Sequence, residues 1–163
     1  MVIKEKFQKT INEQINFELC SSYLYLSMAA YFESTNLPGF AGWFKVQATE
    51  ENGHAMKLFD FIVKRGGKVV LQHIGAPKSE WESPLSVFED FVAHELKATE
   101  MIHSLIKLAK SENDYATEVM LQQFVSEQVE EEAIANITVA KLKLIANSVS
   151  GLLILDKELG GRK

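Results

Sequence analysis

The 163-residue sequence has little cysteine and proline and no long apolar run, and these scarcities exclude several classes of protein. Cys20 is the only cysteine, so no disulfide can form within the chain, and nothing points to an oxidising compartment. The longest apolar runs, such as residues 151–155, are far too short to span a bilayer. Residues 1–10 lack the apolar core of a signal peptide, so we expect a cytoplasmic protein.

Basic stretches are missing as well. The formal net charge is −5, with 17 Lys and Arg against 22 Asp and Glu. Because no block of positive charge is present, we expect the chain to bind neither nucleic acid nor an anionic membrane, whereas a cationic cargo is compatible with the charge. The length is that of one domain with a sizeable core, which we expect to span residues 1–163.

Apolar residues recur at helical spacing over four long segments. Three of them cover about residues 3–33, 40–64 and 115–147, and the remaining one has Ser83 as its N-cap and Pro84 as its first residue and ends by residue 111. Residues 150–159 have the length of a short fifth helix. The sequence therefore predicts an all-α fold, a four-helix bundle with a short C-terminal helix.

The connection between the second and third helices is long. Periodicity disappears between Gly66 and Pro84, and residues 68–72 could form a short extended piece. A connection of this length is typical of a crossover, so we expect the third helix to begin at the opposite end of the bundle. A strand of an α/β fold is the weaker alternative, because no other segment has the pattern of a partner strand.

Each long helix also places polar residues on its apolar stripe. They are Glu18 on the first helix, Glu51 and His54 on the second, Glu95 on the third, and Gln128 and Glu131 on the fourth. Burying an ionised carboxylate costs on the order of several kcal/mol unless it is paired or bound to a metal. A single inward Glu most often reflects a misjudged helix phase, and a single inward His is more often a hydrogen-bonded core residue than a ligand. Four helices that all place such residues inward predict an oxygen-rich metal site with one imidazole, which suits iron or manganese.

The spacing of these residues resembles, but does not complete, a di-iron pattern. Helix bundles that hold two irons take one Glu from each of two helices and a Glu-x-x-His from each of the others. This chain has Glu51-x-x-His54, but Gln128-x-x-Glu131 stands at the place of the second motif. One metal position would therefore have fewer strong ligands than the other. This asymmetry suggests a site where iron is oxidised and then leaves, rather than a permanently bound cofactor.

A second carboxylate group lies beside the first. Its members are Glu50, Glu127, Glu130 and Glu131. They could form another metal-binding cluster, or residues 130–132 could be an ordinary solvated charge run. Tyr25, seven residues after Glu18, could supply an electron or a hydrogen bond to the same seam, or simply pack in the core.

Taken in order, these motifs resemble a prokaryotic non-haem ferritin. The match rests on Glu18…Tyr25, Glu50-Glu51-x-x-His54, Arg65-Gly66-Gly67-Lys68-Val69, His94-Glu95 and Glu127-Gln128-Val129-Glu130-Glu131. The resemblance implies a ferritin-like four-helix bundle with a long crossover between its second and third helices. It also implies a homo-oligomeric shell of 24 subunits that oxidises Fe(II) with dioxygen or hydrogen peroxide and stores ferric mineral inside.

The resemblance also assigns roles to the residues. Glu18, Glu51 and His54 would hold the first iron, and Glu51 would bridge to a second that Glu95 also binds, with Gln128 close by. Tyr25 would take part in oxidation. A third iron site would use Glu50, Glu127, Glu130 and Glu131.

Some features separate this chain from related proteins. A bacterioferritin would carry a second Glu-x-x-His on the fourth helix, which this chain lacks. Haem is not expected, because no methionine is a clear haem ligand, although Met56 is near the motif. Gln123 stands where many bacterial relatives have Trp, so the resemblance carries no aromatic electron donor to that position. Asp114 and Glu118 could line an acidic pore for Fe(II), or could simply be acidic residues at a helix N-terminus.

Two other functions remain as alternatives. A di-iron redox enzyme or peroxidase of the same superfamily would predict a second Glu-x-x-His and usually a Cys-rich domain, and this sequence has neither. A shell without chemistry would have lost Glu51 or His54.

Overall fold

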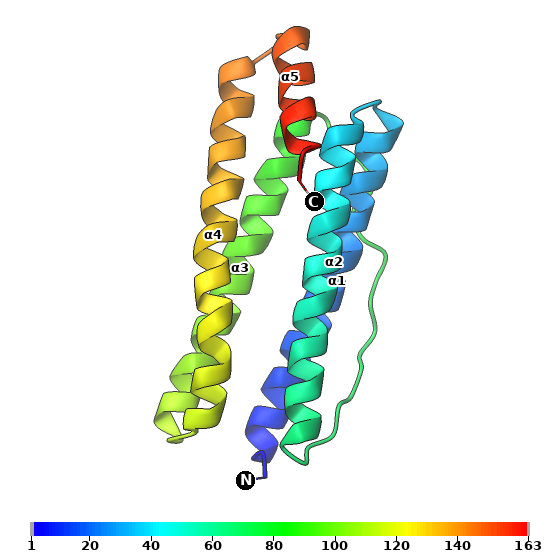
Figure 1. Cartoon of the computed structure of the whole chain (residues 1–163). Helices are drawn as coiled ribbons and strands as arrows, with labels where there is room; N and C mark the ends of the chain where they lie inside the picture. The colour runs from blue at the N-terminus through cyan, green and yellow to red at the C-terminus, as the bar shows by residue number, and fades with distance from the viewer. Residues whose placement is uncertain (1, 163) are drawn as a thin grey trace.

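The computed structural model describes residues 2–162, which contain five helices and no strand. The helices are α1 (Glu5–Ser34), α2 (Pro38–Lys64), α3 (Pro84–Ser111), α4 (Tyr115–Ile145) and α5 (Val149–Leu159). The first four run alongside one another as a bundle, and α5 lies at one end, against the beginning of α2 (Figure 1). The predicted fold class and helix order are confirmed. The expected domain bounds, 1–163, extend one residue beyond the described residues at each end.

The crossover between α2 and α3 runs along the length of the bundle without forming a helix or a strand (Figure 1). The extended piece considered for residues 68–72 is therefore not a strand. Asn12 on α1 holds it instead, because its amide donates to the Lys68 carbonyl oxygen at 3.0 Å and accepts the Val70 N–H at 2.9 Å. As predicted, α3 begins at the end of the bundle opposite to the end of α2.

The helix ends follow local capping chemistry. Ser83 and Ser86 form a capping box at the start of α3, and Pro84 occupies the first turn, as the sequence predicts. Three predicted bounds are wrong by two residues: α1 begins at Glu5, not residue 3, α2 begins at Pro38, not residue 40, and α4 ends at Ile145, not residue 147. The fourth helix stops early because Ala146 adopts a positive φ of 49°, which a helix cannot continue through.

The bundle interior consists of two apolar clusters separated by a polar layer. One cluster lies toward α5 and is rich in aromatic rings, among them Phe32, Phe40, Phe44, Phe88 and Phe91. The other lies toward the opposite end and includes Phe7, Ile11, Leu58, Ile62 and Leu121. Along each of the four long helices, the inward polar residues fall between members of the two clusters. Within residues 2–162, no helix is both long and apolar enough to cross a membrane.

Candidate metal centre

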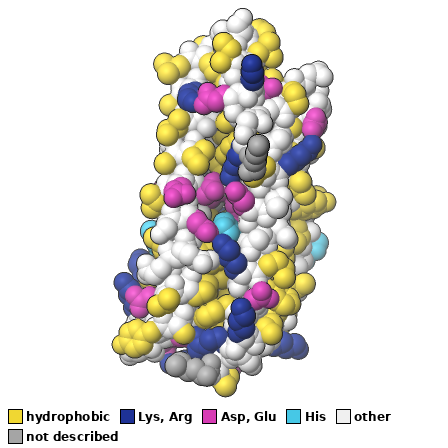
Figure 2. All heavy atoms as spheres, viewed as in Figure 1, with side chains coloured by type: hydrophobic (Ala, Val, Ile, Leu, Met, Phe, Trp, Pro, Cys, Tyr) yellow, Lys and Arg dark blue, Asp and Glu magenta, His cyan; other side chains and the backbone are white. Residues whose placement is uncertain are grey.

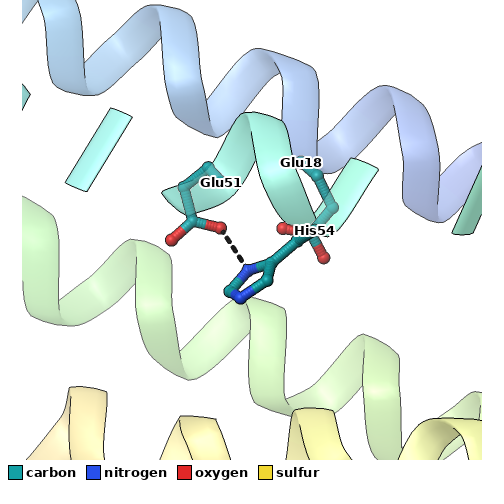
Figure 3. Close-up of side chains that lie close together, drawn as sticks. All are labelled: Glu18, Glu51 and His54. Carbon is teal, nitrogen blue, oxygen red and sulfur yellow. Dashed lines mark hydrogen bonds and ion pairs between the residues drawn. The ribbon is translucent and has the colours of Figure 1, made fainter. Parts of the chain in front are cut away.

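Three side chains of the polar layer converge at mid-bundle. Glu18 comes from α1, and Glu51 and His54 come from adjacent turns of α2 and point toward it (Figure 3). One ligand atom from each lies within 4.8 Å of the others, and the side chains are nearly inaccessible to solvent. The donor set is two carboxylate oxygens and one imidazole nitrogen, which suits iron or another divalent first-row metal.

Helical spacing explains why these groups meet. Glu51 and His54 lie three residues apart on the stripe of α2 that faces the core, and the His54 Nδ1 is 3.1 Å from the Glu51 Oε2. Glu18 lies on the matching stripe of α1, where its Oε1 accepts a hydrogen bond from the Gln14 amide at 2.6 Å. The apolar clusters on either side therefore fix the helix faces that bring the three groups together.

Burial makes the two carboxylates hard to ionise. Desolvation, followed by the charge of Glu51, raises the pKa of Glu18 to about 8. Desolvation, followed by the charge of Glu95, also raises the pKa of Glu51 to about 8. A cation between these carboxylates would compensate the charge that burial leaves unscreened, so the electrostatics of the cluster favour metal binding.

Glu95 on α3 extends the polar layer. It is 1% exposed, and burial raises its pKa. Tyr25 donates its hydroxyl hydrogen to one Glu95 oxygen, and the Gln128 amide donates to the other at 3.0 Å. Tyr25 therefore makes the hydrogen bond considered from the sequence, and Gln128 lies beside Glu95 as the resemblance implies. Both contacts hold the carboxylate in a fixed orientation.

The second carboxylate group lines a pocket of about 410 Å³. We call this the acidic pocket, and its walls include Glu50, Glu127, Glu130, Glu131 and His54. Figure 2 shows acidic side chains gathered around a histidine midway along the face between α2 and α4. The pocket also contains two basic side chains, Lys57 and Arg162.

Glu131 shows that the acidic pocket is more than a solvated charge run. It accepts a hydrogen bond from the Gln47 amide at 2.9 Å. Burial, followed by the charge of Glu95, raises its pKa to about 7. Glu130, by contrast, is exposed. The structure therefore brings together all four residues predicted for this group, but at different depths.

Two side chains connect the buried centre to the acidic pocket. The imidazole of His54 lies between Glu51 and Glu127, with its Nε2 2.9 Å from the Glu127 Oε2. The Gln47 amide nitrogen donates to Glu51 at 3.3 Å as well as to Glu131. A substitution of either residue would therefore remove contacts to carboxylates of both the buried centre and the acidic pocket.

Sequence reasoning missed three residues of this region. Gln14 and Gln47 each stand four residues before a predicted ligand, Glu18 and Glu51, so the spacing of one helical turn was a usable signal. Arg162, which contacts Glu50, lies 112 residues from it in the sequence, and no local pattern marks such a contact.

The two residues considered for an acidic pore have other contacts within the subunit. The Asp114 side chain is 4% exposed, pairs with Arg65 at 2.9 Å and caps α4 by accepting the Thr117 N–H. These contacts favour the interpretation of Asp114 as an acidic residue at a helix N-terminus over its interpretation as a pore residue. Glu118 lies in the first turn of α4, 3.8 Å from Lys110.

Comparison with known proteins agrees with this geometry. The family model described as "Ferritin-like domain" matches residues 8–145. The bacterial non-heme ferritin of Bacteroides fragilis is 44% identical over 161 residues, covering 99% of this chain and all of the relative. That of Staphylococcus epidermidis is 36% identical over 161 residues, covering 99% of this chain and 97% of the relative.

Solved structures give the same result. An open-pore ferritin from the hyperthermophilic archaeon Archaeoglobus fulgidus superimposes with a TM-score of 0.97 at 52% identity, over 99% of each chain. Both sequence and fold therefore match over almost the whole chain, and the protein belongs to the ferritin family, with bacterial non-heme ferritins among its relatives.

Proposed function

We propose that this chain is an iron-storage ferritin with ferroxidase activity. It oxidises Fe(II) to Fe(III) inside each subunit and retains the ferric product as mineral within a homo-oligomeric shell of 24 copies. The observation that carries this proposal is the buried cluster of Glu18, Glu51 and His54, whose ligand atoms lie within 4.8 Å of one another. The relatives named bacterial non-heme ferritin support it.

Each residue of the polar layer has a role in the proposal. Glu18, Glu51 and His54 bind one Fe(II), and Glu51 and Glu95 bind a second. Gln128 and Tyr25 orient the Glu95 carboxylate through the hydrogen bonds described above. Two Fe(II) ions together supply the two electrons that reduce dioxygen to hydrogen peroxide, or hydrogen peroxide to water, and the oxidant takes up two protons.

The carboxylates also handle protons. Because the pKa values of Glu18 and Glu51 are both raised to about 8, these groups are largely protonated in the metal-free protein at neutral pH. Fe(II) binding displaces those protons, as metal binding to protonated ligands does in general. The protons are released close to where the oxidant is reduced.

The acidic pocket is the proposed third iron site. Glu50, Glu127, Glu130 and Glu131 offer carboxylate oxygens beside His54. Carboxylates at a more exposed position suit Fe(III) that has left the buried centre, because hard cations prefer oxygen ligands. A di-iron enzyme that keeps its metal would need a stronger second position than Glu95 and Gln128 provide.

Rapid mixing of the metal-free shell with Fe(II) in air tests the proposal. Glu51→Ala removes the shared ligand and should abolish the fast oxidation phase, while size-exclusion chromatography shows an intact shell. Glu100→Ala, an exposed glutamate on α3, is the matched control and should keep the wild-type rate. An unchanged rate in Glu51→Ala would refute the assignment.

A further inference from the structure

The C-terminal segment places a positive charge in the acidic pocket. The Arg162 guanidinium pairs with Glu50, donates to the Gln47 Oε1 at 2.7 Å and stacks on Trp43 with its central carbon 4.7 Å from the ring centroid. Its side chain is only 21% exposed. These contacts fix Arg162 at three points along α2 rather than leaving it as a free surface arginine.

The docking of α5 delivers Arg162 to this position. The Phe40 N–H donates to the Asp156 carboxylate at 2.9 Å. A Cβ at Gly39 would lie 1.7 Å from the Asp156 carbonyl oxygen, so only glycine allows the two backbones to come this close. Because α5 is held at the start of α2, the residues that follow it extend along the α2 face that continues to Trp43, Gln47 and Glu50.

Arg162 also sets the orientation of the Gln47 amide. Since the guanidinium is a donor, it fixes the amide oxygen toward itself and turns the amide nitrogen toward Glu51 and Glu131. A lysine could not reproduce this arrangement, because its single ammonium lacks the planar fork that contacts Glu50 and Gln47 together while stacking on Trp43.

The guanidinium competes with any other cation for the same acceptors. Glu50 gives one of its oxygens to Arg162, and a metal bound to that carboxylate would have to share it or replace the guanidinium. Lys57 neutralises Glu127 from the other side of the pocket, at 3.2 Å, but contacts neither Glu50 nor Gln47. The two basic residues therefore differ in how directly they compete.

We propose that Arg162 is a built-in counter-ion of the acidic pocket, which binds Glu50 when the pocket holds no metal and is displaced from Glu50 and Trp43 when a divalent cation binds there. The pocket affinity is thereby set by the C-terminal segment. The proposal rests on the proposed function in taking the acidic pocket as a cation site and iron as the natural cation.

Zinc titration of the metal-free, assembled protein is the test, because Zn²⁺ is redox-inert and its binding does not depend on ferroxidase activity. Arg162→Ala should strengthen the weaker class of Zn²⁺ sites by about tenfold in isothermal calorimetry, the size expected for losing one charge-assisted competitor. Arg162→Lys should give a smaller gain, because lysine keeps the positive charge but loses the planar fork. Lys57→Ala, the matched control, should change the affinity less than about threefold, as expected for an exposed ion pair.

Two further measurements identify the site and the movement. Adding Glu130→Gln to Arg162→Ala should erase the gain if the site is the acidic pocket. In a Trp81→Phe background, where Trp43 is the remaining tryptophan, Zn²⁺ should change the fluorescence of the protein with Arg162 and not that of Arg162→Ala.

A Zn²⁺ affinity of Arg162→Ala within twofold of wild type would overturn the inference. So would a Trp43 fluorescence that does not change when Zn²⁺ is added to the protein with Arg162. Either result leaves the ferroxidase proposal standing, since the iron oxidation rate of Glu51→Ala tests that proposal separately.

Discussion

The buried centre and the acidic pocket are both rich in carboxylates, but they balance their charge in different ways. Among residues 2–162, the hydrogen-bond partners of Glu18, Glu51 and Glu95 are amide, hydroxyl and imidazole groups, and Glu18 and Glu51 also hydrogen-bond to each other. In the acidic pocket, Glu50 and Glu127 pair with Arg162 and Lys57. The buried centre therefore balances its charge by holding protons. The pocket uses basic side chains at Glu50 and Glu127, and burial raises the pKa of its deepest member, Glu131.

Because of this difference, the two sites of one polar layer should respond differently to pH. A site that holds protons gains affinity for metal as the pH rises, because the metal no longer has to displace them. A site neutralised by a guanidinium exchanges one cation for another and depends less on pH. His54 and Gln47 each contact carboxylates of both groups.

Removing the shared imidazole should have the largest effect. His54→Ala deletes a ligand of the buried centre and a wall of the pocket, and we expect the initial rate of Fe(II) oxidation to fall by about 100-fold or more. Glu130→Gln, which changes only the pocket, should lower that rate less than about fivefold. Stopped-flow absorbance at about two Fe(II) per subunit measures both. Equal losses would contradict the separation of the two sites.

Glu18→Gln should show how much the buried carboxyl group of Glu18 lowers the stability of the metal-free protein. Between the ordinary pKa of 4.5 and the folded value of about 8, the folded protein keeps a proton that the unfolded chain has lost, so stability falls as the pH rises through this range. Glutamine removes this loss and should stabilise the metal-free protein on the order of 2–4 kcal/mol at pH 8, and much less at pH 5. Thermal unfolding with a chelator present measures it.

The matched control for this stability prediction is Glu130→Gln. Because Glu130 is exposed, its substitution should leave the thermal stability nearly unchanged at both pH values. A Glu18→Gln protein that is no more stable than wild type at pH 8 would show that the carboxylate is not destabilised by burial.

Proton release should distinguish the two sites directly. Zn²⁺ added at pH 7 to the metal-free protein should release about one to two protons per ion bound at the buried centre, because both Glu18 and Glu51 have pKa values near 8. A pH-indicator dye follows this release. In Glu51→Ala the release should fall by about half or more, and an undiminished release would contradict the assignment.

The smallest expected effect is that of Gln14→Leu. The substitution removes the 2.6 Å hydrogen bond to Glu18 while leaving every proposed ligand in place. We expect Zn²⁺ affinity at the buried centre to fall about threefold to tenfold, the lower range for residues that orient a ligand. Gln122→Leu, on the exposed face of α4, is the control. Equal Zn²⁺ affinities in both variants would contradict a role for Gln14 in orienting the Glu18 carboxylate.

The architecture could be predicted because long amphipathic helices have a strong period. Glu18, Glu51, His54, Glu95 and Gln128 are all buried, as their positions on apolar stripes predict. The helix ends were less predictable, because the stop at Ala146 depends on a single backbone torsion. Asp114 was ambiguous for a similar reason, since its capping of α4 and its pairing with Arg65 depend on tertiary structure.

Contacts between distant parts of the chain lie beyond sequence reasoning. The hydrogen bonds of Asn12 to the crossover join residues more than fifty positions apart, with separations of 56 and 58. The contact of Arg162 with Glu50 depends on how α5 docks against Gly39. Neither has a period, a motif or a local spacing that marks it.

Anomalous X-ray diffraction from crystals loaded with Fe(II) without oxygen tests the central claim most directly. The account predicts iron peaks at two positions in the polar layer, one among Glu18, Glu51 and His54 and one between Glu51 and Glu95, with a weaker peak in the acidic pocket. Iron confined to the acidic pocket, with none beside Glu18, would contradict it.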